Sequence, residues 1–362
     1  MLRNACSGLL VAFTVAAGCG GTQTAAPAPS TESPTKPVAD RSVPERRYPV
    51  AGLEAAATIT VDRWGVPHIE ASTTDDLFFA QGFNAARDRL WQLDLWKRRG
   101  EGRLAEALGP SYVEQDRAAR LFVYRGAMDA EWASYGPDAK LIASAFTAGI
   151  NAYIDLCDTR VELLPHAFRI LGYRPLRWTP ETVVRIRSHG LARNVTSELA
   201  RAQHVRSFGL DSLALRDRLE PSHQVSIPAG LDLDAIAGDV LRLYRLARQQ
   251  VSFPAERWAN LDTSTGRGSN NWVVSSSRTA TGRPMLANDP HRRVTVPSLR
   301  YLVHLKAPGL DVIGGGEPAL PGISIGHNGR IAFGLTVFWI DQEDLYVYET
   351  HPEDPRKYRY GD

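Results

Sequence analysis

Three segments in the later part of the chain place polar side chains and glycines at the edges of expected strands. In the first, Gly266–Trp272, a serine at position 269 stands where a polar run meets a strand. The second, Leu286–His291, ends in Asn-Asp-Pro-His, and the third, Gly326–Thr336, begins with Gly-His-Asn-Gly. A serine that follows glycine in a loop is usually structural, since its hydroxyl is a weak nucleophile without a base. The segments therefore indicate chemistry only when they are taken together, in this order and at this spacing.

Taken together, the three segments resemble the penicillin acylase family of N-terminal nucleophile hydrolases, which includes penicillin, cephalosporin and acyl-homoserine-lactone acylases. The similarity runs from about Ile59 to the last residue and includes Asp62–Ile69, Gly82–Gln92 and Thr196–Glu198. Members of this family are made as one chain, cut themselves to release a spacer and keep the two pieces as an αβ heterodimer. The resemblance implies an amide hydrolase of EC class 3.5.1 that cleaves a linear amide, such as the N-acyl group of a β-lactam or an acyl-homoserine lactone.

The resemblance also implies an α+β fold, the four-layer αββα sandwich of N-terminal nucleophile hydrolases. We expect this sandwich to be incomplete at the C-terminus, because the last region is shorter than the family's catalytic subunit and the oxyanion-hole Asn would lie beyond residue 362. The expected regions are a lipoprotein signal peptide, a flexible tether, a helical α-subunit-like region, a spacer and the N-terminal part of the catalytic β-subunit, at residues 1–18, 19–47, 48–250, 251–268 and 269–362.

By this resemblance Ser269 is the nucleophile, and the Gly268–Ser269 bond is the cleavage site. Cleavage would give Ser269 a free α-amine, whose ordinary pKa of about 7.7–8.0 suits it to accept the hydroxyl proton through one bridging water. Nucleophile and base would then occupy one residue. Before the cut, the same hydroxyl could attack the carbonyl of Gly268, which glycine leaves sterically open.

Two further residues are assigned catalytic roles by the resemblance. His291 lies where penicillin acylases carry Gln and the other acylases carry His, so its backbone and ring would orient the amine and hydroxyl of Ser269. Val337 matches the residue whose main-chain N–H forms half of the oxyanion hole, and such a donor can contribute about 3 kcal/mol in the transition state. The competing interpretations are a loop histidine after Pro290 and an ordinary sheet residue.

The acyl pocket is expected next to His291. The stretch from Ser269 to Arg292 resembles the glutaryl-cephalosporin acylases in particular, in which an arginine and a tyrosine at the positions of Arg292 and Tyr301 hold the carboxylate at the far end of the acyl chain. A guanidinium pairs well with a carboxylate in a bidentate arrangement. The resemblance therefore implies an acyl group with a terminal negative charge, although a solvated Arg292 is an equal alternative.

A calcium site is also implied by the resemblance. Glu198, Asp341, Asp344 and the carbonyl of Glu343 match positions that bind Ca²⁺ in penicillin acylases. Oxygen ligands from carboxylates and a carbonyl suit a hard cation. The alternative is a solvated acidic turn.

The N-terminus has the features of an export signal. An apolar run from Leu9 to Ala17 follows Arg3 and ends in Ala-Ala-Gly before Cys19. The run is too short to span a bilayer, and its end resembles the lipobox of bacterial lipoproteins, which makes Cys19 the expected lipidation site. We expect an exported protein that is held at the cell membrane through a lipid anchor, or that is periplasmic or extracellular. The alternative is an ordinary cleaved signal.

Hydrophobic periodicity predicts the elements that must position these residues. Residues 57–61 alternate as a strand, and apolar residues from Phe79 to Leu93 recur at helical spacing with polar residues on the opposite face. Residues 129–250 look mainly helical and are interrupted by prolines. Further strands are expected at residues 271–274, 285–287, 301–305, 323–325 and 331–337, and Asn328-Gly329 should form a hairpin turn between the last two.

Composition restricts the class of function. Forty-two basic and 40 acidic residues give a formal net charge of +2, which is too small for a nucleic-acid binder. No organic cofactor motif is present, so the expected partners are a small-molecule amide and the protein's own processed pieces. Two other functions remain open: a truncated, inactive remnant that acts as a non-enzymatic lipoprotein, and a β-lactamase or penicillin-binding protein. The second lacks partner motifs for its only Ser-x-x-Lys, Ser33–Lys36.

Overall fold

The computed structural model describes most of the chain after the expected tether. The described residues are 45–186, 194–216, 224–236, 238–251, 268–292, 295–336 and 341–361. Cys19 and the expected signal peptide, nearly all of the expected spacer, and Val337 lie outside the described residues. Pro49–Asp362 forms one compact unit.

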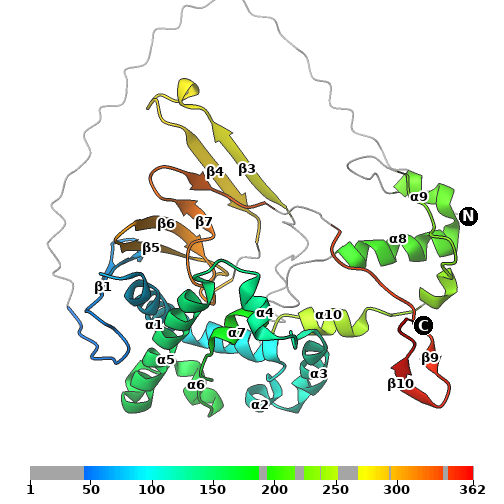
Figure 1. Cartoon of the computed structure of the whole chain (residues 1–362), viewed down its shortest axis with the longest axis horizontal. Coiled ribbons are helices and arrows are strands. Elements are labelled where there is room, and N and C mark those ends of the chain that lie inside the picture. The colour runs from blue at the N-terminus through cyan, green and yellow to red at the C-terminus, as the bar shows by residue number, and fades with distance from the viewer. Residues whose placement is uncertain are drawn as a thin grey trace, which may run out of the picture. The chain divides into compact units, whose positions relative to one another are not determined.

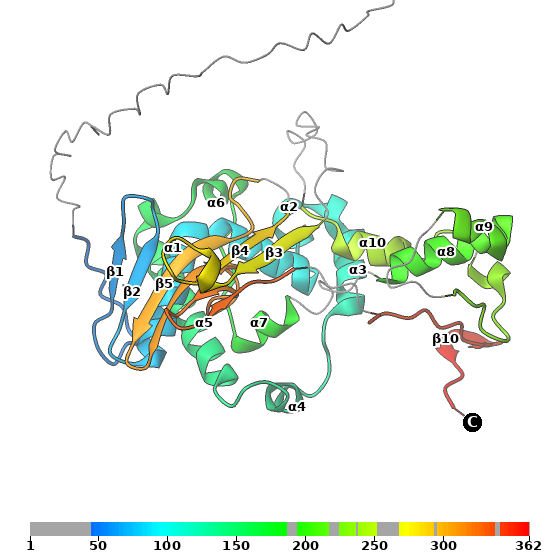
Figure 2. The same ribbon diagram turned by 90° about the horizontal axis from the view of Figure 1, so that it is seen from above.

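A six-stranded mixed sheet joins strands from the two ends of this unit (Figures 1 and 2). Its order is β1-β2-β5-β6-β7-β8, and all neighbours are antiparallel except β2 and β5, which are parallel. The strand predicted at residues 57–61 is confirmed as β1, and the predicted Asn328-Gly329 hairpin joins β7 to β8. The bounds are β1 Thr58–Val61, β2 Pro67–Glu70, β5 Tyr301–Ala307, β6 Leu310–Gly316, β7 Ile325–His327 and β8 Ala332–Phe333.

The long helices α1 (Thr74–Glu101) and α5 (Ala139–Thr159) lie against one face of this sheet (Figure 1). Side chains along β5 alternate between buried and exposed positions, and Val303 and Leu305 are fully buried in one cluster with Leu77 of α1. This period of two is what a strand with one covered face requires. The opposite face of β5 carries Leu302, His304 and Lys306.

Two glycines set the distance between α1 and α5. A Cβ atom at Gly82 would lie 1.9 Å from the carbonyl oxygen of Phe146, and one at Gly149 would lie 1.9 Å from the carbonyl oxygen of Phe79. Each helix therefore presents a glycine to the other's backbone. Any larger side chain at either position would force the two helices apart.

The polar face of α1 is buried as well as its apolar face. The side chain of Gln81 is fully buried, donates to the Tyr301 hydroxyl (3.0 Å) and the Gly322 carbonyl (3.1 Å), and accepts from the Gly322 N–H (2.8 Å). Gln92, further along the same helix, donates to the carbonyl of Ser298 (3.0 Å). These amides fasten α1 to the region that follows the candidate nucleophile.

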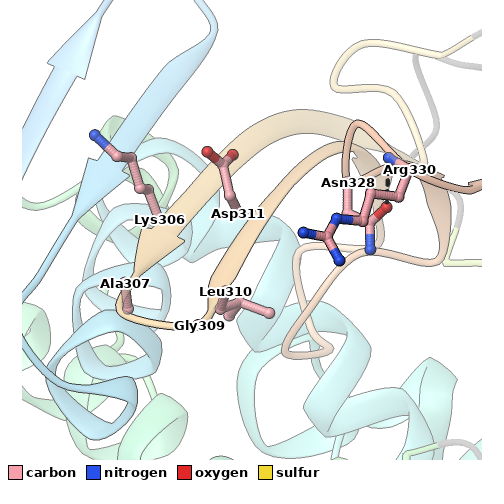
Figure 3. Close-up of a pocket in the computed structure, with 7 residues that line it drawn as sticks. All are labelled: Lys306, Ala307, Gly309, Leu310, Asp311, Asn328 and Arg330. Carbon is pink, nitrogen blue, oxygen red and sulfur yellow. Dashed lines mark hydrogen bonds between the residues drawn. The ribbon is translucent and has the colours of Figure 1, made fainter.

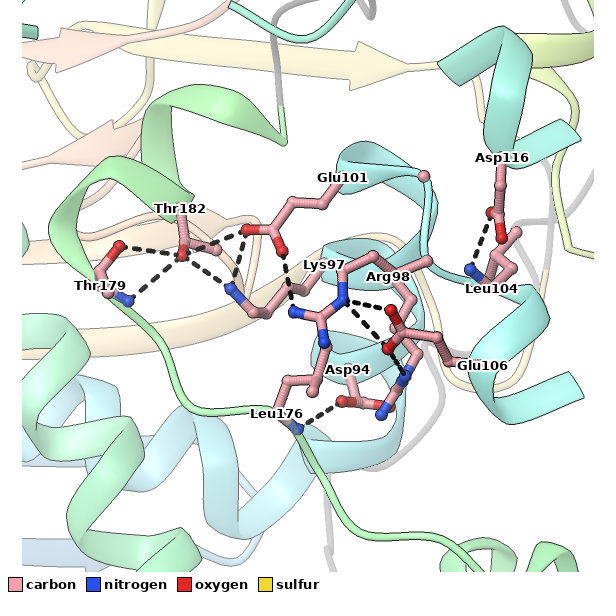
Figure 4. Close-up of polar contacts among 12 residues, drawn as sticks. Asp94, Lys97, Arg98, Glu101, Leu104, Glu106, Asp116, Leu176, Thr179 and Thr182 are labelled. Carbon is pink, nitrogen blue, oxygen red and sulfur yellow. Dashed lines mark hydrogen bonds and ion pairs between the residues drawn. The ribbon is translucent and has the colours of Figure 1, made fainter. Parts of the chain in front are cut away.

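The second half of α1 holds a buried network of charges (Figure 4). Asp94 accepts from Arg98 Nε (2.8 Å) and from the backbone N–H of Leu176 (2.8 Å), and burial raises the pKa of its carboxyl. Lys97 donates to Glu101 (2.8 Å) and to Thr182 (2.9 Å), and burial lowers the pKa of its ammonium. Because each buried charge has a partner, the network attaches α1 to α7 (Pro180–Arg185) and to the chain that leads into it.

The prediction that residues 129–250 are mainly helical is confirmed for the described part of that range. Among the described residues, none of the helices combines the length and the apolar character that a membrane crossing requires. The remaining helices are α2 Ala105–Leu108, α3 Val113–Phe122, α4 Met128–Ala133, α6 His166–Leu171, α7 Pro180–Arg185, α8 Asn194–Phe208, α9 Leu210–Arg216 and α10 Arg242–Arg248.

Four further strands form two separate hairpins. β3 (Ser269–Val274) pairs with β4 (Met285–Pro290), and β9 (Thr350–His351) pairs with β10 (Asp354–Tyr358). β6 was not predicted from the sequence, because Gly314, Gly315 and Gly316 depress strand propensity. At Gly314 a Cβ atom would lie 2.0 Å from the carbonyl oxygen of Ile325, so the glycine allows β6 and β7 to approach closely.

Candidate active site

The candidate nucleophile begins β3, directly opposite Pro290 of β4. The hydroxyl of Ser269 donates to the carbonyl oxygen of Gly268 at 2.5 Å. The backbone N–H of His291 donates to the same oxygen at 3.2 Å. Gly268 has a φ of +153°, which side chains rarely adopt. The carbonyl before the serine is thus held by two donors at a position that requires glycine.

The ring of His291 lies against this glycine and is held by the hairpin. A Cβ atom at Gly268 would lie 3.2 Å from His291 Nδ1. On the other side of the ring, Nε2 lies 3.0 Å from Asp289 Oδ2 and 3.2 Å from Asn270 Nδ2. A hydrogen on Nε2 donated to Asp289 leaves Nδ1 as the free nitrogen that faces Gly268. The structure therefore brings His291 next to the Gly268–Ser269 bond and adds Asp289, which sequence reasoning did not assign.

Asn288 is a second residue that sequence reasoning missed. Its side-chain amide acts like the backbone of a neighbouring strand: Oδ1 accepts from the N–H of Leu335 (3.2 Å), and Nδ2 donates to the carbonyl of Leu335 (2.9 Å) and to that of Asn270 (3.2 Å). Gly334 fits against Asn288, where a Cβ atom would be 3.0 Å from the side chain. Asn288 thereby fastens residues 334–336 to the hairpin that carries Ser269. Val337 follows this segment in the sequence.

The two residues expected to hold an acyl carboxylate occupy different environments. Arg292 is exposed and donates through Nη1 to the carbonyl of His291 (2.7 Å). Tyr301 is buried, its hydroxyl accepts from Gln81, and burial raises its pKa to about 12. No hydrogen bond joins Arg292 to Tyr301 in the described part of the chain. The structure thus places the arginine at the surface and the tyrosine in the core.

The residues expected to bind calcium converge from distant parts of the chain. Carboxylate oxygens of Glu198, Asp341 and Asp344 all lie within 4.8 Å of one another. The carboxylate of Glu343 accepts from the hydroxyl of Tyr244 instead (2.8 and 3.0 Å), while its backbone carbonyl accepts from Asn194 Nδ2 (2.8 Å). Calcium binding by these residues stays a prediction.

The side-chain amide of Asn194 is the hydrogen-bond donor to the oxygens of this cluster. Its Nδ2 atom lies 2.8 Å from each of three oxygens, on Glu198, Asp341 and the Glu343 carbonyl. An amide nitrogen has two hydrogens and cannot satisfy three acceptors. The group of oxygens therefore has capacity for additional positive charge, and hard oxygen donors of this kind fit Ca²⁺.

Comparison with known proteins assigns the family. The sequence profile described as penicillin amidase matches residues 56–362. The chain belongs to the penicillin amidase family. The match covers every described candidate residue above, from Asn194 to Asp344, and the mixed helix and strand content agrees with the expected α+β class.

Relatives within the penicillin amidase family carry two kinds of name. The chain is 34% identical over 318 residues to a penicillin acylase 2 proenzyme of Pseudomonas sp. (strain SE83), covering 86% of this chain and 40% of the relative. It is 30% identical over 322 residues to the acyl-homoserine lactone acylase QuiP of Pseudomonas aeruginosa, covering 87% and 37%. A solved thermostable penicillin G acylase from Alcaligenes faecalis is 26% identical with a TM-score of 0.39, covering 48% of this chain and 98% of that chain. The chain spans about 40% of the length of the curated relatives.

The role of Asn288 can be tested by amide hydrogen exchange. Replacing Asn288 with Ala removes the acceptor for the Leu335 N–H, so we expect peptides that contain Leu335 to exchange at least ten times faster. As a matched control, Asn328→Ala removes the acceptor for the N–H groups of Arg330 and Ile331 and should speed exchange there and not at Leu335. Unchanged protection of the Leu335 N–H in the Asn288 variant would show that Asn288 does not hold this segment.

Proposed function

We propose that the full-length protein is an acylase that cleaves a linear amide through Ser269, after cutting its own chain at the Gly268–Ser269 bond. The observation that carries this proposal is the carbonyl of Gly268, which accepts from both the Ser269 hydroxyl and the His291 N–H at a glycine with positive φ. In a member of the penicillin amidase family, this arrangement suits an attack of the serine on the bond that precedes it.

The proposed cut is an N-to-O acyl shift. The Ser269 Oγ attacks the carbonyl carbon of Gly268, the C–N bond to Ser269 breaks, and the proton of the hydroxyl passes to the departing nitrogen. The N–H of His291 stabilises the negative charge that develops on the carbonyl oxygen. The shift frees the Ser269 amine, and water then hydrolyses the resulting ester, which restores the Ser269 hydroxyl and leaves a new carboxylate at Gly268.

The freed amine then serves the amide substrate. It accepts the proton of the Ser269 hydroxyl through a water molecule while Oγ attacks the substrate carbonyl. The amine of the substrate leaves with that proton, and a second water releases the acid from the acyl-enzyme. In this proposal the His291 ring, oriented by Asp289, positions the amine, and the N–H of Val337 is one of the two oxyanion donors.

The same proposal includes the organisation of the mature protein. The two pieces would remain together as an αβ heterodimer, which agrees with the parallel pairing of β2 and β5 across the proposed cut. Export and lipidation of Cys19 remain expectations from the sequence. A protein that stays uncut and inactive would instead match the non-enzymatic remnant.

Self-processing can be tested by N-terminal sequencing of the purified full-length protein. We expect the wild-type protein to yield a fragment that begins Ser-Asn-Asn-Trp, because Ser269 supplies the attacking oxygen. Ser269→Ala should stay uncut and lose amidase activity by at least 10³-fold. Ser275→Ala, at the position directly after the same strand, should process normally. Cleavage at this bond in the Ser269 variant would contradict the mechanism.

We further propose that Arg292 selects acyl groups that end in a carboxylate. Its exposed guanidinium lies one residue after His291, and a guanidinium forms strong charge-assisted hydrogen bonds with a carboxylate. Tyr301 could join it only by leaving its hydrogen bond with Gln81. The proposal therefore rests on Arg292 alone, with Tyr301 supporting the sheet beneath.

Acyl preference can be measured with glutaryl, phenylacetyl and long-chain acyl amides of one chromogenic amine. We expect kcat/KM to favour the glutaryl amide about 10–100-fold, since a hydrogen bond to a charged group contributes about 1.5–3 kcal/mol. Arg292→Gln should remove this preference and leave the phenylacetyl rate unchanged. No preference for the acidic chain in the wild-type protein would contradict the assignment.

We also propose that Glu198, Asp341, Asp344 and the carbonyl of Glu343 hold a structural calcium ion. The ion would link α8 to the segment at residues 341–344, and it would neutralise carboxylates that Asn194 alone cannot satisfy. Its role would be to hold the two proposed pieces together. It takes no part in the proposed chemistry.

Thermal unfolding with and without calcium tests this proposal. Calcium at about 100 times its Kd should stabilise the wild-type protein by about 2.7 kcal/mol, and a chelator should reverse the shift. Asp341→Asn should abolish the response. Asp354→Asn, which changes a partly buried carboxylate paired with Arg356 outside this cluster, should retain it. A wild-type protein that does not respond to calcium would refute the site.

A further inference from the structure

Two histidines meet on the outer face of the six-stranded sheet, apart from the groups that the proposed hydrolysis uses. His68 of β2 and His304 of β5 stand directly opposite each other in the parallel pairing. Their Nδ1 atoms are 2.9 Å apart, and the rings are nearly perpendicular, at 87°. Their side chains are 37% and 23% exposed. The contact is therefore nitrogen to nitrogen and open to small ions.

Each ring has a carboxylate at its other nitrogen. His304 Nε2 lies 2.8 Å from Asp311 Oδ1, and His68 Nε2 lies 3.5 Å from Asp62 Oδ2. The second oxygen of Asp62 accepts from the N–H of Val66 at 2.9 Å, which is the main reason that the pKa of this carboxyl is lowered. A carboxylate beside Nε2 accepts the hydrogen on that nitrogen and leaves the lone pair of Nδ1 free.

This arrangement leaves two lone pairs facing each other. If His68 and His304 each donate Nε2–H to a carboxylate, both Nδ1 atoms are unprotonated at a separation of 2.9 Å. Two lone pairs at that distance repel unless a positive charge lies between or beside them. We propose that His68 and His304 bind a divalent copper-class metal ion through their Nδ1 atoms, with Asp62 and Asp311 as supporting carboxylates and water as the remaining ligands.

The distance between the two nitrogens favours this class of metal. Metal–nitrogen bonds of about 2.0–2.1 Å that meet at a right angle place the nitrogens about 2.9 Å apart, whereas a tetrahedral angle separates them by about 3.3 Å. Right-angled nitrogen ligands are typical of Cu²⁺ and Ni²⁺, and Cu²⁺ binds most tightly among the divalent first-row ions.

The charges around the histidine pair are compatible with a cation. The one nearby lysine, Lys306, donates to Glu70 at 2.9 Å, so its charge is already compensated among the described residues. Asp311 borders a shallow hollow of about 430 Å³ (Figure 3), and its carboxylate and Lys306 project from paired positions of neighbouring strands. The carboxylates of Asp62 and Asp311 add negative charge on both sides of the pair.

Copper titration of the full-length protein, followed by electron paramagnetic resonance, tests the site. We expect one Cu²⁺ per chain with hyperfine coupling to two imidazole nitrogens. His304→Gln and His68→Gln should each weaken binding at least tenfold and reduce the coupling to one nitrogen. Asp311→Asn keeps both ligands, so its spectrum should still show two nitrogens while affinity falls about 10–100-fold. Circular dichroism of each variant checks that it is folded.

Two controls separate this site from other metal-binding groups. His351→Gln changes an exposed histidine outside the pair, and Asp341→Asn changes the proposed calcium cluster. Both should bind Cu²⁺ as the wild type does. Absence of stoichiometric binding would mean that a shared proton alone joins the two rings and would overturn the proposal. Binding that survives in the folded variant lacking both His68 and His304 would also overturn it.

Discussion

The burial of α1 on both of its faces is the constraint on which the rest of the structure depends. Its apolar side chains pack against β5, and Gly82 lets the backbone of α5 approach closely. The side-chain amide of Gln81 forms hydrogen bonds with Tyr301 and Gly322. A helix that is polar on one face would normally leave that face in water. Here the polar face is satisfied by the segments that follow Ser269, so the helical region and the strand-rich region fold as one unit.

The candidate active site depends on the β3–β4 hairpin. β3 and β4 place Ser269 beside Pro290, and the same antiparallel register places the N–H and ring of His291 beside Gly268. Asn288 then attaches the segment before Val337 to the same hairpin. The proposed nucleophile, its orienting histidine and the path to the oxyanion donor are therefore organised by two strands and one side-chain amide.

Local sequence patterns predicted a helix, a strand and a hairpin of this structure. The period of α1, the strand at β1 and the Asn328-Gly329 hairpin follow from spacing and turn preference. The resemblance to a family also assembled Glu198 with Asp341 and Asp344, which no local pattern could do. Asn288 and the His68–His304 pair were missed because their roles arise from contacts between segments that are not adjacent in sequence. Asp289 was missed because its contact with the ring of His291, two residues later, depends on side-chain orientation. β6 was missed because its glycines, which allow it to lie close to β7, have a low strand propensity.

The central claim is that Ser269 becomes an N-terminal nucleophile, and a covalent label tests it most directly. The full-length protein would be treated with phenylmethylsulfonyl fluoride, digested, and mapped by tandem mass spectrometry. Our account predicts one sulfonyl group on the Oγ of Ser269, in a peptide whose first residue is that serine with a free amine. A label on another residue, or a labelled peptide in which the Gly268–Ser269 bond is intact, would contradict it.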